Sequence, residues 1–281
     1  MGANAYLDLL LRLSALNFLL LCDLQLAGQK SFSMPNMKAS PMTLSVIIPA
    51  YNELETLQDI LDRVNNAAPM DKEIILVDDF STDGTRELLS RIENESRFDV
   101  KVLYHEKNHG KGAALRTGIA AATGDFVIIQ DADLEYDPSE YASLLKPLTS
   151  DLADVVYGSR FTDKARGRFT SLQNHWGNKI LTKLSNLFTH LGLTDMETCY
   201  KVFRREIIKP ISIEENRFGF EPEVTAKIAA TGCRVLELPI SYNPRSYAEG
   251  KKIGWRDAAR AVWCILKYRI KAGKPKRKHK N

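Results

Sequence analysis

Three acidic residues follow a short apolar run in residues 125–135, which read Asp-Phe-Val-Ile-Ile-Gln-Asp-Ala-Asp-Leu-Glu. The run Phe126–Ile129 is typical of a buried parallel strand, because it is apolar and rich in β-branched residues. Ligands of open α/β sheets bind beyond the carboxyl ends of the strands. The position of Asp131, Asp133 and Glu135 therefore predicts that they lie at the mouth of a binding site.

Carboxylates this close together repel one another unless a cation lies among them. Oxygen ligands favour Mg²⁺ or Mn²⁺, and these ions usually also bind phosphate groups of the substrate. We therefore predict a metal site formed by Asp131, Asp133 and Glu135. The alternative is that the acids cap the next helix or lie in a solvated loop, so the rest of the chain must decide.

The first half of the chain alternates between strand and helix patterns. Apolar runs predict strands at 44–50, 73–79, 100–105, 126–129 and 154–158. Helical periodicity predicts helices at 53–67, through Leu88 to Ile92, at 113–122 and from Pro138 to 148. This alternation predicts an α/β fold with a single Rossmann-like, mostly parallel sheet flanked by helices.

The second half is less regular. We expect helices at 172–191, 222–231 and 254–270, and strands at 198–204 and 234–242. No interdomain linker is evident, so residues 43–252 are predicted to form one catalytic domain. Residues 253–281 are predicted to add a C-terminal helix and a basic tail.

Residues 1–40 fit this pattern poorly. The segment is leucine-rich, but its uninterrupted apolar part is too short to span a bilayer. It is an interfacial amphipathic helix, a poor signal-anchor, or upstream sequence translated from an early start codon. We favour the last interpretation, because Met34, Met37 and Met42 could each begin an ordinary chain.

The composition is that of an ordinary globular protein, with 281 residues, 44% hydrophobic and 26% charged. The four cysteines are scattered without metal-ligand spacing, which indicates reduced thiols and a cytoplasmic protein. Neither the glycine fingerprint of dinucleotide-binding folds nor a P-loop is present. A net charge of +4 does not indicate a nucleic-acid-binding protein.

Polar residues follow three of the predicted strands in the same topological position. They are Pro49 to Glu53 after the first strand, Asp78 and Asp79 after the second, and Asp131 to Asp133 after the fourth. Tyr51 could stack on a base, and Asp79 or Glu53 could accept hydrogen bonds from a base or ribose. Lys111 and the glycines beside it could approach a phosphate or a base. Together they predict a nucleotide site.

These motifs resemble family 2 glycosyltransferases with a GT-A fold. The resemblance rests on Pro49-Ala-Tyr-Asn-Glu, Val77-Asp-Asp-Phe-Ser-Thr-Asp-Gly-Thr, Asn108-x-Gly-Lys-Gly and Asp131-Ala-Asp, and it covers about residues 44–252. Within the family, the chain resembles dolichyl- or polyprenyl-phosphate mannosyl- and glucosyltransferases most. The resemblance implies a hexose donor such as GDP-mannose or UDP-glucose, and the sequence leaves both open.

The resemblance also implies which residues hold the donor. The nucleotide is expected at a set drawn from three strand ends and the glycine-rich turn: Pro49, Tyr51, Asn52, Glu53, Asp78, Asp79, Lys111, Gly112, Asp131, Ala132 and Asp133. Asp131 and Asp133 are also expected to be catalytic, as ligands of Mg²⁺ or Mn²⁺ together with Glu135. The position of Glu135 often holds Gln in this family, so Glu adds a charge there.

The acceptor is implied to be a polyprenyl phosphate, such as dolichyl or undecaprenyl phosphate. Arg160, Arg168, Arg245 and Lys251 resemble family positions that contact the lipid phosphate or close over it. Guanidinium groups bind phosphate oxygens bidentately, which suits this role. The same cations could instead form a solvated face.

The kind of acceptor decides whether a base is needed. A phosphate is already ionised near neutral pH and can attack the anomeric carbon directly, with inversion. A hydroxyl acceptor needs a general base, and Asp195 is then the candidate. With a phosphate acceptor, Asp195 is expected to orient Arg or Lys side chains.

Three other functions remain as alternatives. A family 2 enzyme could act on a sugar or lipid hydroxyl. A sugar-1-phosphate nucleotidyltransferase also uses a metal and an α/β sheet, but the glycine-rich first loop of that class is absent after residue 50. A non-catalytic membrane- or nucleic-acid-binding protein would bind no nucleotide sugar.

The C-terminal helix predicts contact with a membrane. Trp255, Trp263, Tyr268 and several cations lie in residues 254–270, and a basic tail follows. Aromatic and basic residues on one helix favour attachment to an anionic leaflet. We expect a cytoplasmic protein bound peripherally at the cytoplasmic face, although a surface-packed helix with a solvated tail is the alternative.

Overall fold

The computed structural model describes residues 42–67, 71–94, 99–162, 172–245 and 255–271. All of them belong to one compact unit, which begins at Pro41. The predicted boundaries at residues 40 and 252 stay predictions, because they fall at or beside residues outside these ranges. None of the helices in the described ranges is long and apolar enough to span a bilayer.

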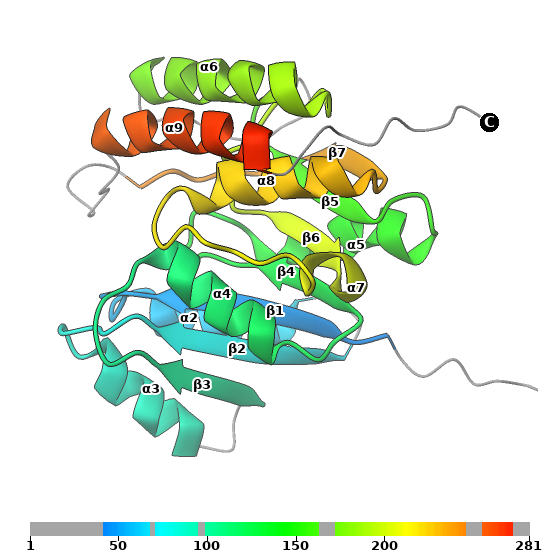
Figure 1. The fold of residues 1–281 in the computed structure, drawn as a ribbon. Coiled ribbons are helices and arrows are strands. Elements are labelled where there is room, and N and C mark those ends of the chain that lie inside the picture. The colour runs from blue at the N-terminus through cyan, green and yellow to red at the C-terminus, as the bar shows by residue number, and fades with distance from the viewer. Residues whose placement is uncertain (1–41, 68–70, 95–98, 163–171, 246–254, 272–281) are drawn as a thin grey trace, which may run out of the picture. The chain divides into compact units, whose positions relative to one another are not determined.

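Within the described ranges, the centre of the fold is a seven-stranded sheet in the order β3-β2-β1-β4-β6-β5-β7 (Figure 1). All strands run in one direction except β6, which is antiparallel to β4 and β5. This confirms the mostly parallel sheet. The strands are β1 (Leu44–Ala50), β2 (Lys72–Asp78), β3 (Val100–Tyr104), β4 (Phe126–Ile129), β5 (Val155–Ser159), β6 (Lys201–Arg204) and β7 (Val235–Pro239).

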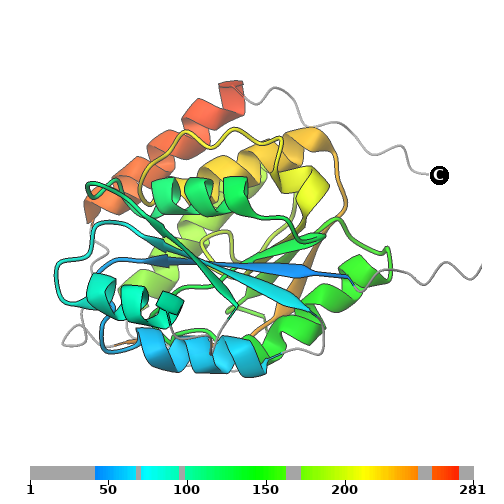
Figure 2. The ribbon, with the colours of Figure 1, turned by 90° about the horizontal axis from the view of Figure 1, so that it is seen from below.

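Helices cover both faces of this sheet (Figure 2). The helix α4 lies on one face together with α8, and α2 and α5 lie on the other. The helices are α2 (Leu57–Asn66), α3 (Thr85–Asn94), α4 (Lys111–Ala121), η1 (Pro138–Glu140), α5 (Tyr141–Thr149), α6 (Leu172–Thr189), α7 (Arg205–Ile208), α8 (Phe220–Thr231) and α9 (Trp255–Lys271).

Local sequence explains how these layers pack. The helix α2 buries Leu57, Ile60, Leu61 and Val64, which recur at helical spacing along one face. The helix α4 can lie close to β1, because Gly118 has no Cβ and a Cβ there would overlap the side chain of Ile47. Close approach of α4 brings the start of this helix, at Lys111, to the carboxyl edge of the sheet.

The helices α6 and α9 form a further layer beyond α8 (Figure 1). They pack through a small apolar cluster of Leu181, Met196, Ala261 and Ile265. The predicted strand at 198–204 is too long at its start, since β6 begins at Lys201. The residues before it pass the end of β4 instead, where the backbone N–H of Cys199 donates to the Tyr136 hydroxyl.

Candidate active site

The ends of β1, β2 and β4 lie at one edge of the sheet, because these three strands are parallel neighbours. Tyr51, Asp79 and Asp131 follow the three strands directly or within two residues. This confirms the arrangement of strand ends on which the predicted nucleotide site depends.

Backbone strain is concentrated at the same edge. Among the described non-glycine residues, five have a positive φ, and three of them are Asn52 (56°), Phe80 (66°) and Leu134 (62°). These three follow β1, β2 and β4 respectively. Phe and Leu rarely adopt this conformation, and such strain clusters at functional sites. The sequence carried no signal of it.

The loops after β1 and β2 are fastened to each other. The backbone N–H of Asn52 donates to Ser81 Oγ at 3.0 Å, and Asn52 Oδ1 accepts from the Thr82 N–H at 2.8 Å. The Glu53 N–H donates to Thr85 Oγ1 at 3.0 Å. Tyr51, directly before Asn52, keeps 39% of its surface exposed. Asn52 therefore shapes the loop that presents Tyr51.

Asp78 and Asp79 are both buried, and each organises a different loop. Asp78 Oδ2 lies 3.0 Å from Arg86 Nε. Asp79 Oδ1 lies 2.7 Å from His105 Nδ1 and accepts from the His109 N–H at 2.9 Å. Asp79 Oδ2 accepts from the Gly110 N–H at 2.6 Å. Asp79 thus holds the glycine-rich turn in place, a contact that the sequence did not indicate.

The glycines of this turn are required for packing. A Cβ on Gly110, which has a φ of +101°, would lie 2.5 Å from the backbone oxygen of Asn216. A Cβ on Gly112 would overlap the backbone of Glu215. The turn at 108–112 therefore closes against residues 215–217, and this contact positions Lys111.

Lys111 joins two acids from different elements. Its Nζ lies 2.7 Å from Asp131 Oδ1 and 3.6 Å from Glu221 Oε1, which comes from the start of α8. Burial opposes the charge of Lys111, but these carboxylates outweigh burial and raise its pKa well above the ordinary value. Lys111 is therefore a fixed cation beside Asp131.

Asp133 has a cationic partner as well. Arg245 Nη2 lies 3.0 Å from Asp133 Oδ2, and Arg245 Nη1 lies 3.2 Å from Glu53 Oε2. Burial, followed by the charges of Asp131 and Glu135, raises the pKa of Asp133 to about 7. The surroundings of Asp133 therefore favour additional positive charge.

Both carboxylate oxygens of Glu135 already accept hydrogen bonds. Glu135 Oε2 accepts from the Tyr242 hydroxyl at 2.7 Å, and Oε1 accepts from the Arg245 N–H at 2.9 Å. Glu135 therefore holds the segment that carries Arg245. Its predicted role as a metal ligand stays a prediction.

Asp131 and Asp133 have the chemistry that a divalent metal requires. Their oxygens are hard donors at the edge where the polar strand ends meet, and burial, followed by the neighbouring negative charges, raises the pKa of Asp133. No group of three or more His, Cys, Asp or Glu side chains with metal-binding geometry occurs in the described ranges. An Mg²⁺ or Mn²⁺ ion would be held by Asp131 and Asp133, with a diphosphate supplying further oxygens.

Arg160 and Asp195 form a buried, bidentate pair. Arg160 Nε donates to Asp195 Oδ2 at 2.7 Å, and Arg160 Nη2 donates to Asp195 Oδ1 at 2.8 Å. The Arg160 guanidinium also lies 5.0 Å from the centroid of the Tyr242 ring. Two predicted acceptor residues, Arg168 and Lys251, lie outside the described residues.

Sequence reasoning missed several polar and charged residues near these pairs. Glu197, Thr198, Lys201 and Glu221 lie in or beside the site, and Lys201 is buried under the Tyr157 ring. Burial, then the charge of Glu221, raises the pKa of Glu197 to about 8. An acid two residues after Asp195 was visible in the sequence, but the burial of its Oε1 atom was not.

Known proteins resemble this chain in both sequence and fold. The profile of Glycosyl transferase family 2 matches residues 45–212. The dolichol-phosphate mannosyltransferase of Pyrococcus furiosus is 28% identical over 222 residues, which cover 76% of this chain and 60% of that protein. The polyprenol monophosphomannose synthase of Mycolicibacterium smegmatis is 30% identical over 219 residues, which cover 74% of this chain and 80% of that protein.

The fold resembles that of solved glycosyltransferases. Glucosyl-3-phosphoglycerate synthase from Mycobacterium tuberculosis, in complex with Mn²⁺ and UDP-glucose, matches with a TM-score of 0.61 at 20% identity. That match covers 84% of this chain and 80% of the synthase. The chain spans less than two thirds of the Pyrococcus relative. The chain therefore belongs to glycosyl transferase family 2 and has the GT-A fold that the sequence predicted.

Proposed function

We propose that this chain transfers a hexose from a nucleoside-diphosphate sugar to a polyprenyl phosphate, with Mg²⁺ or Mn²⁺ as cofactor and with inversion at the anomeric carbon. The donor is GDP-mannose or UDP-glucose. The matched relatives named as dolichol-phosphate and polyprenol-phosphate mannose enzymes support this class of acceptor.

The observation that carries the proposal is the pairing of Asp195 with Arg160. Both oxygens of Asp195 accept from the guanidinium, and Oδ2 also accepts from the Arg160 backbone N–H at 3.1 Å. A carboxylate held in this way is poorly placed to take a proton from a hydroxyl. It instead holds Arg160 at the acceptor side, where a phosphate would need a cation.

Arg245 supplies a second cation for phosphate. Its Nε is buried and has no hydrogen-bond partner among the described residues. Its two other nitrogens reach Glu53 and Asp133, so the guanidinium lies beside the predicted metal ligands. An anionic phosphate would give the remaining N–H an acceptor.

The chemistry follows from these positions. A bound Mg²⁺ or Mn²⁺ would stabilise the negative charge of the departing nucleoside diphosphate. Asp131 and Asp133 hold that end of the donor, Lys111 adds positive charge beside it, and Arg160 and Arg245 orient the acceptor phosphate. The phosphate oxygen attacks the anomeric carbon from the face opposite the leaving group, which inverts its configuration.

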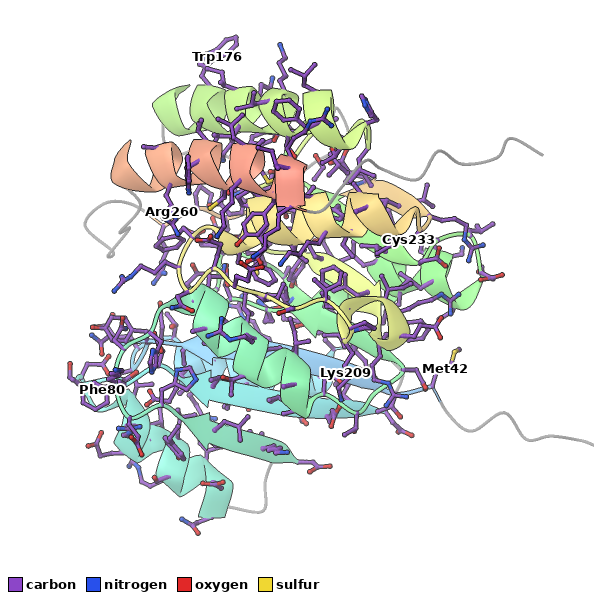
Figure 3. The ribbon with its side chains drawn as sticks, viewed as in Figure 1. Met42, Phe80, Trp176, Lys209, Cys233 and Arg260 are labelled. Carbon is purple, nitrogen blue, oxygen red and sulfur yellow. The ribbon has the colours of Figure 1, made fainter. Side chains whose placement is uncertain are left out.

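A peripheral membrane contact is proposed through α6 and α9. Large apolar side chains are exposed on both helices, at Trp176, Ile180 and Leu187 of α6 and at Val262, Trp263, Leu266 and Ile270 of α9. Trp176 points outward from α6 (Figure 3). The helix α6 contains lysines but no Asp or Glu, which suits an anionic leaflet. Tyr268, predicted from the sequence to belong to this surface, is buried instead.

The test is a radiolabel assay with GDP-mannose and UDP-glucose, each offered to a polyprenyl phosphate and to the matching polyprenol, with Mn²⁺ or Mg²⁺. We expect label from one donor to enter the polyprenyl phosphate but not the polyprenol. Adding EDTA should abolish this incorporation. Transfer to the polyprenol, or no transfer to either lipid, would contradict the proposal.

Two variants separate a phosphate from a hydroxyl acceptor. If Asp195 only positions Arg160, then Arg160→Ala should lose at least as much activity as Asp195→Asn. If Asp195 is the base for a hydroxyl, Asp195→Asn should lose all activity while Arg160→Ala loses little.

A further inference from the structure

Residues 195–199 connect the carboxylate that holds Arg160 with the end of β4. At one end, Asp195 holds Arg160 on the acceptor side. Near the other end, Cys199 lies against the end of β4, with its Sγ 3.7 Å from the Ile129 oxygen. Two residues of extended chain span at most about 7 Å. The Cα of Glu197 therefore lies within about that distance of both Asp195 and Cys199.

The charges that act on Glu197 come from both sides. After burial, the largest influences on its carboxyl are Glu221, Lys201 and Arg160. Glu221 lies beside Lys111, which binds Asp131 on the donor side. Arg160 belongs to the acceptor side. Glu197 therefore lies near both the groups assigned to the donor diphosphate and those assigned to the acceptor phosphate.

One carboxylate oxygen of Glu197 lacks a hydrogen-bond donor. Glu197 Oε1 is buried, and no described residue donates to it. The hydroxyl of the next residue, Thr198 Oγ1, is also buried without a partner in the described part of the chain. Leaving buried polar atoms unpaired is costly, so native structures rarely do so without a functional reason.

We propose that Glu197 accepts hydrogen bonds from hydroxyl groups of the transferred hexose and helps to select which hexose is used. The inference rests on the proposed hexose transfer. The sugar must lie between the diphosphate and the acceptor phosphate, and Glu197 lies near the groups assigned to both. Its hydroxyls can donate to a carboxyl oxygen in either protonation state, and the Thr198 hydroxyl offers a second polar partner.

A structural role is the alternative, in which Glu197 only balances the charge of buried Lys201. The two roles differ in what they do to sugar selectivity. Charge balance would affect binding of nucleoside diphosphate and of every donor alike. A hydrogen bond to one hydroxyl would affect only donors that carry that hydroxyl.

The experiment measures donor affinity by calorimetry with Mn²⁺, for wild type, Glu197→Ala and Glu197→Gln. The titrants are the nucleoside diphosphate, the accepted nucleoside-diphosphate hexose, and its analogues that each lack one hydroxyl. Glu87→Ala, on the exposed surface of α3, is the matched control. The isosteric Glu197→Gln serves if the alanine variant fails to fold.

We expect wild type to bind one deoxy analogue about ten to a hundred times more weakly than the full donor. In Glu197→Ala that discrimination should vanish, while affinity for the nucleoside diphosphate stays within about threefold. Glu197→Gln keeps an oxygen acceptor, so it should retain part of the discrimination between the full donor and the deoxy analogue. The inference would be overturned if both variants discriminated between the donor and its deoxy analogues as wild type does. It would also be overturned if the affinity for every titrant, including the nucleoside diphosphate, fell equally.

The radiolabel assay on the wild type keeps the two proposals distinguishable. If the wild type transfers hexose but Glu197 variants keep full discrimination, only the inference about Glu197 is wrong. If the wild type neither binds nor transfers any nucleoside-diphosphate hexose, the proposed function and the inference both fail.

Discussion

At the scale of residues, charged side chains of this site occur in pairs of opposite charge. Lys111 lies 2.7 Å from Asp131, Arg245 lies 3.0 Å from Asp133, and Arg160 lies 2.7 Å from Asp195. A sequence shows the members of such pairs but not the pairing, because the partners are between 20 and 112 positions apart. Their arrangement gives each acid a distinct role.

Replacing Asp131 with Asn tests the donor end at this scale. Asn keeps the size of the side chain but removes the charge that pairs with Lys111 and that the proposed metal would need. We expect kcat to fall about a thousandfold, as for other groups that stabilise transition-state charge. Melting temperature should change by only a few degrees, because Asn can still accept a hydrogen bond from Lys111.

The control for this variant is Asp99→Asn, an exposed acid beside β3 at the far side of the sheet. It should keep wild-type kcat. Wild-type turnover in Asp131→Asn would remove Asp131 from the catalytic residues.

At the scale of elements, three side chains of α9 donate to the same carboxylate. Glu215 accepts from Arg260 Nη2 at 2.7 Å, from Lys267 Nζ at 2.9 Å and from the Tyr268 hydroxyl at 3.0 Å. Arg260 comes from α9 (Figure 3). Glu215 and the two residues after it pack against the glycine-rich turn that carries Lys111. Helix α9 and the turn that carries Lys111 are therefore supported by the same segment, residues 215–217.

The pH dependence of stability should reveal this contact. Burial disfavours the charge of Glu215, but its three donors outweigh burial and lower its pKa to about 2. Since an unfolded Glu has a pKa of about 4.3, Glu215 stabilises the fold fully above that pH. Its contribution is lost as the pH falls from about 4.3 to about 2.

The measurement compares urea unfolding of wild type and Glu215→Gln. At pH 7 we expect the variant to be less stable by about 2 kcal/mol, a typical value for hydrogen bonds to a charged group. The difference should narrow as the pH is lowered below about 4. A constant difference from pH 7 to pH 3 would mean that the charge of Glu215 contributes nothing.

Gly112→Ala tests the same segment from the other side. The new Cβ would overlap the Glu215 backbone, so the turn must shift. We expect a loss of about 1–3 kcal/mol in unfolding free energy, as for other overpacked sites, and weaker donor binding because Lys111 moves with the turn. Gly177→Ala, where a Cβ meets nothing within 4 Å, is the control. Unchanged stability and donor affinity in Gly112→Ala would show that the turn does not depend on this contact.

For the molecule as a whole, the layer of α6 and α9 presents exposed apolar side chains. Trp263 is 57% exposed and Ile270 is 84% exposed, on a helix whose last turn contains Arg269 and Lys271. Such side chains next to cations favour contact with an anionic lipid surface. They contribute little to the core, so changing them should leave the fold intact.

We therefore expect the double substitution Trp263→Glu and Ile270→Glu to reduce binding to phosphatidylglycerol vesicles by tenfold or more in co-sedimentation. Leu152→Glu, at a side chain that is 65% exposed next to α5, is the matched control. It should bind vesicles like wild type. Equal vesicle binding by all three proteins would place the membrane contact elsewhere.

By itself, the sequence determined the alternation of strands and helices and the polar strand ends. These are local properties: apolar runs such as Phe126–Ile129 are confirmed as strands, and acids directly follow them. It also allowed the three ends to be placed at one edge, since parallel neighbours share a carboxyl edge.

Only the tertiary structure decided what each acid contacts. Asp79 holds a glycine-rich turn, Glu135 holds the Arg245 segment, and Glu197 has a buried oxygen without a partner among the described residues. These roles depend on contacts between residues up to 110 positions apart and on burial in a low-dielectric interior. Spacing along the chain carries neither, because both arise only when the layers pack.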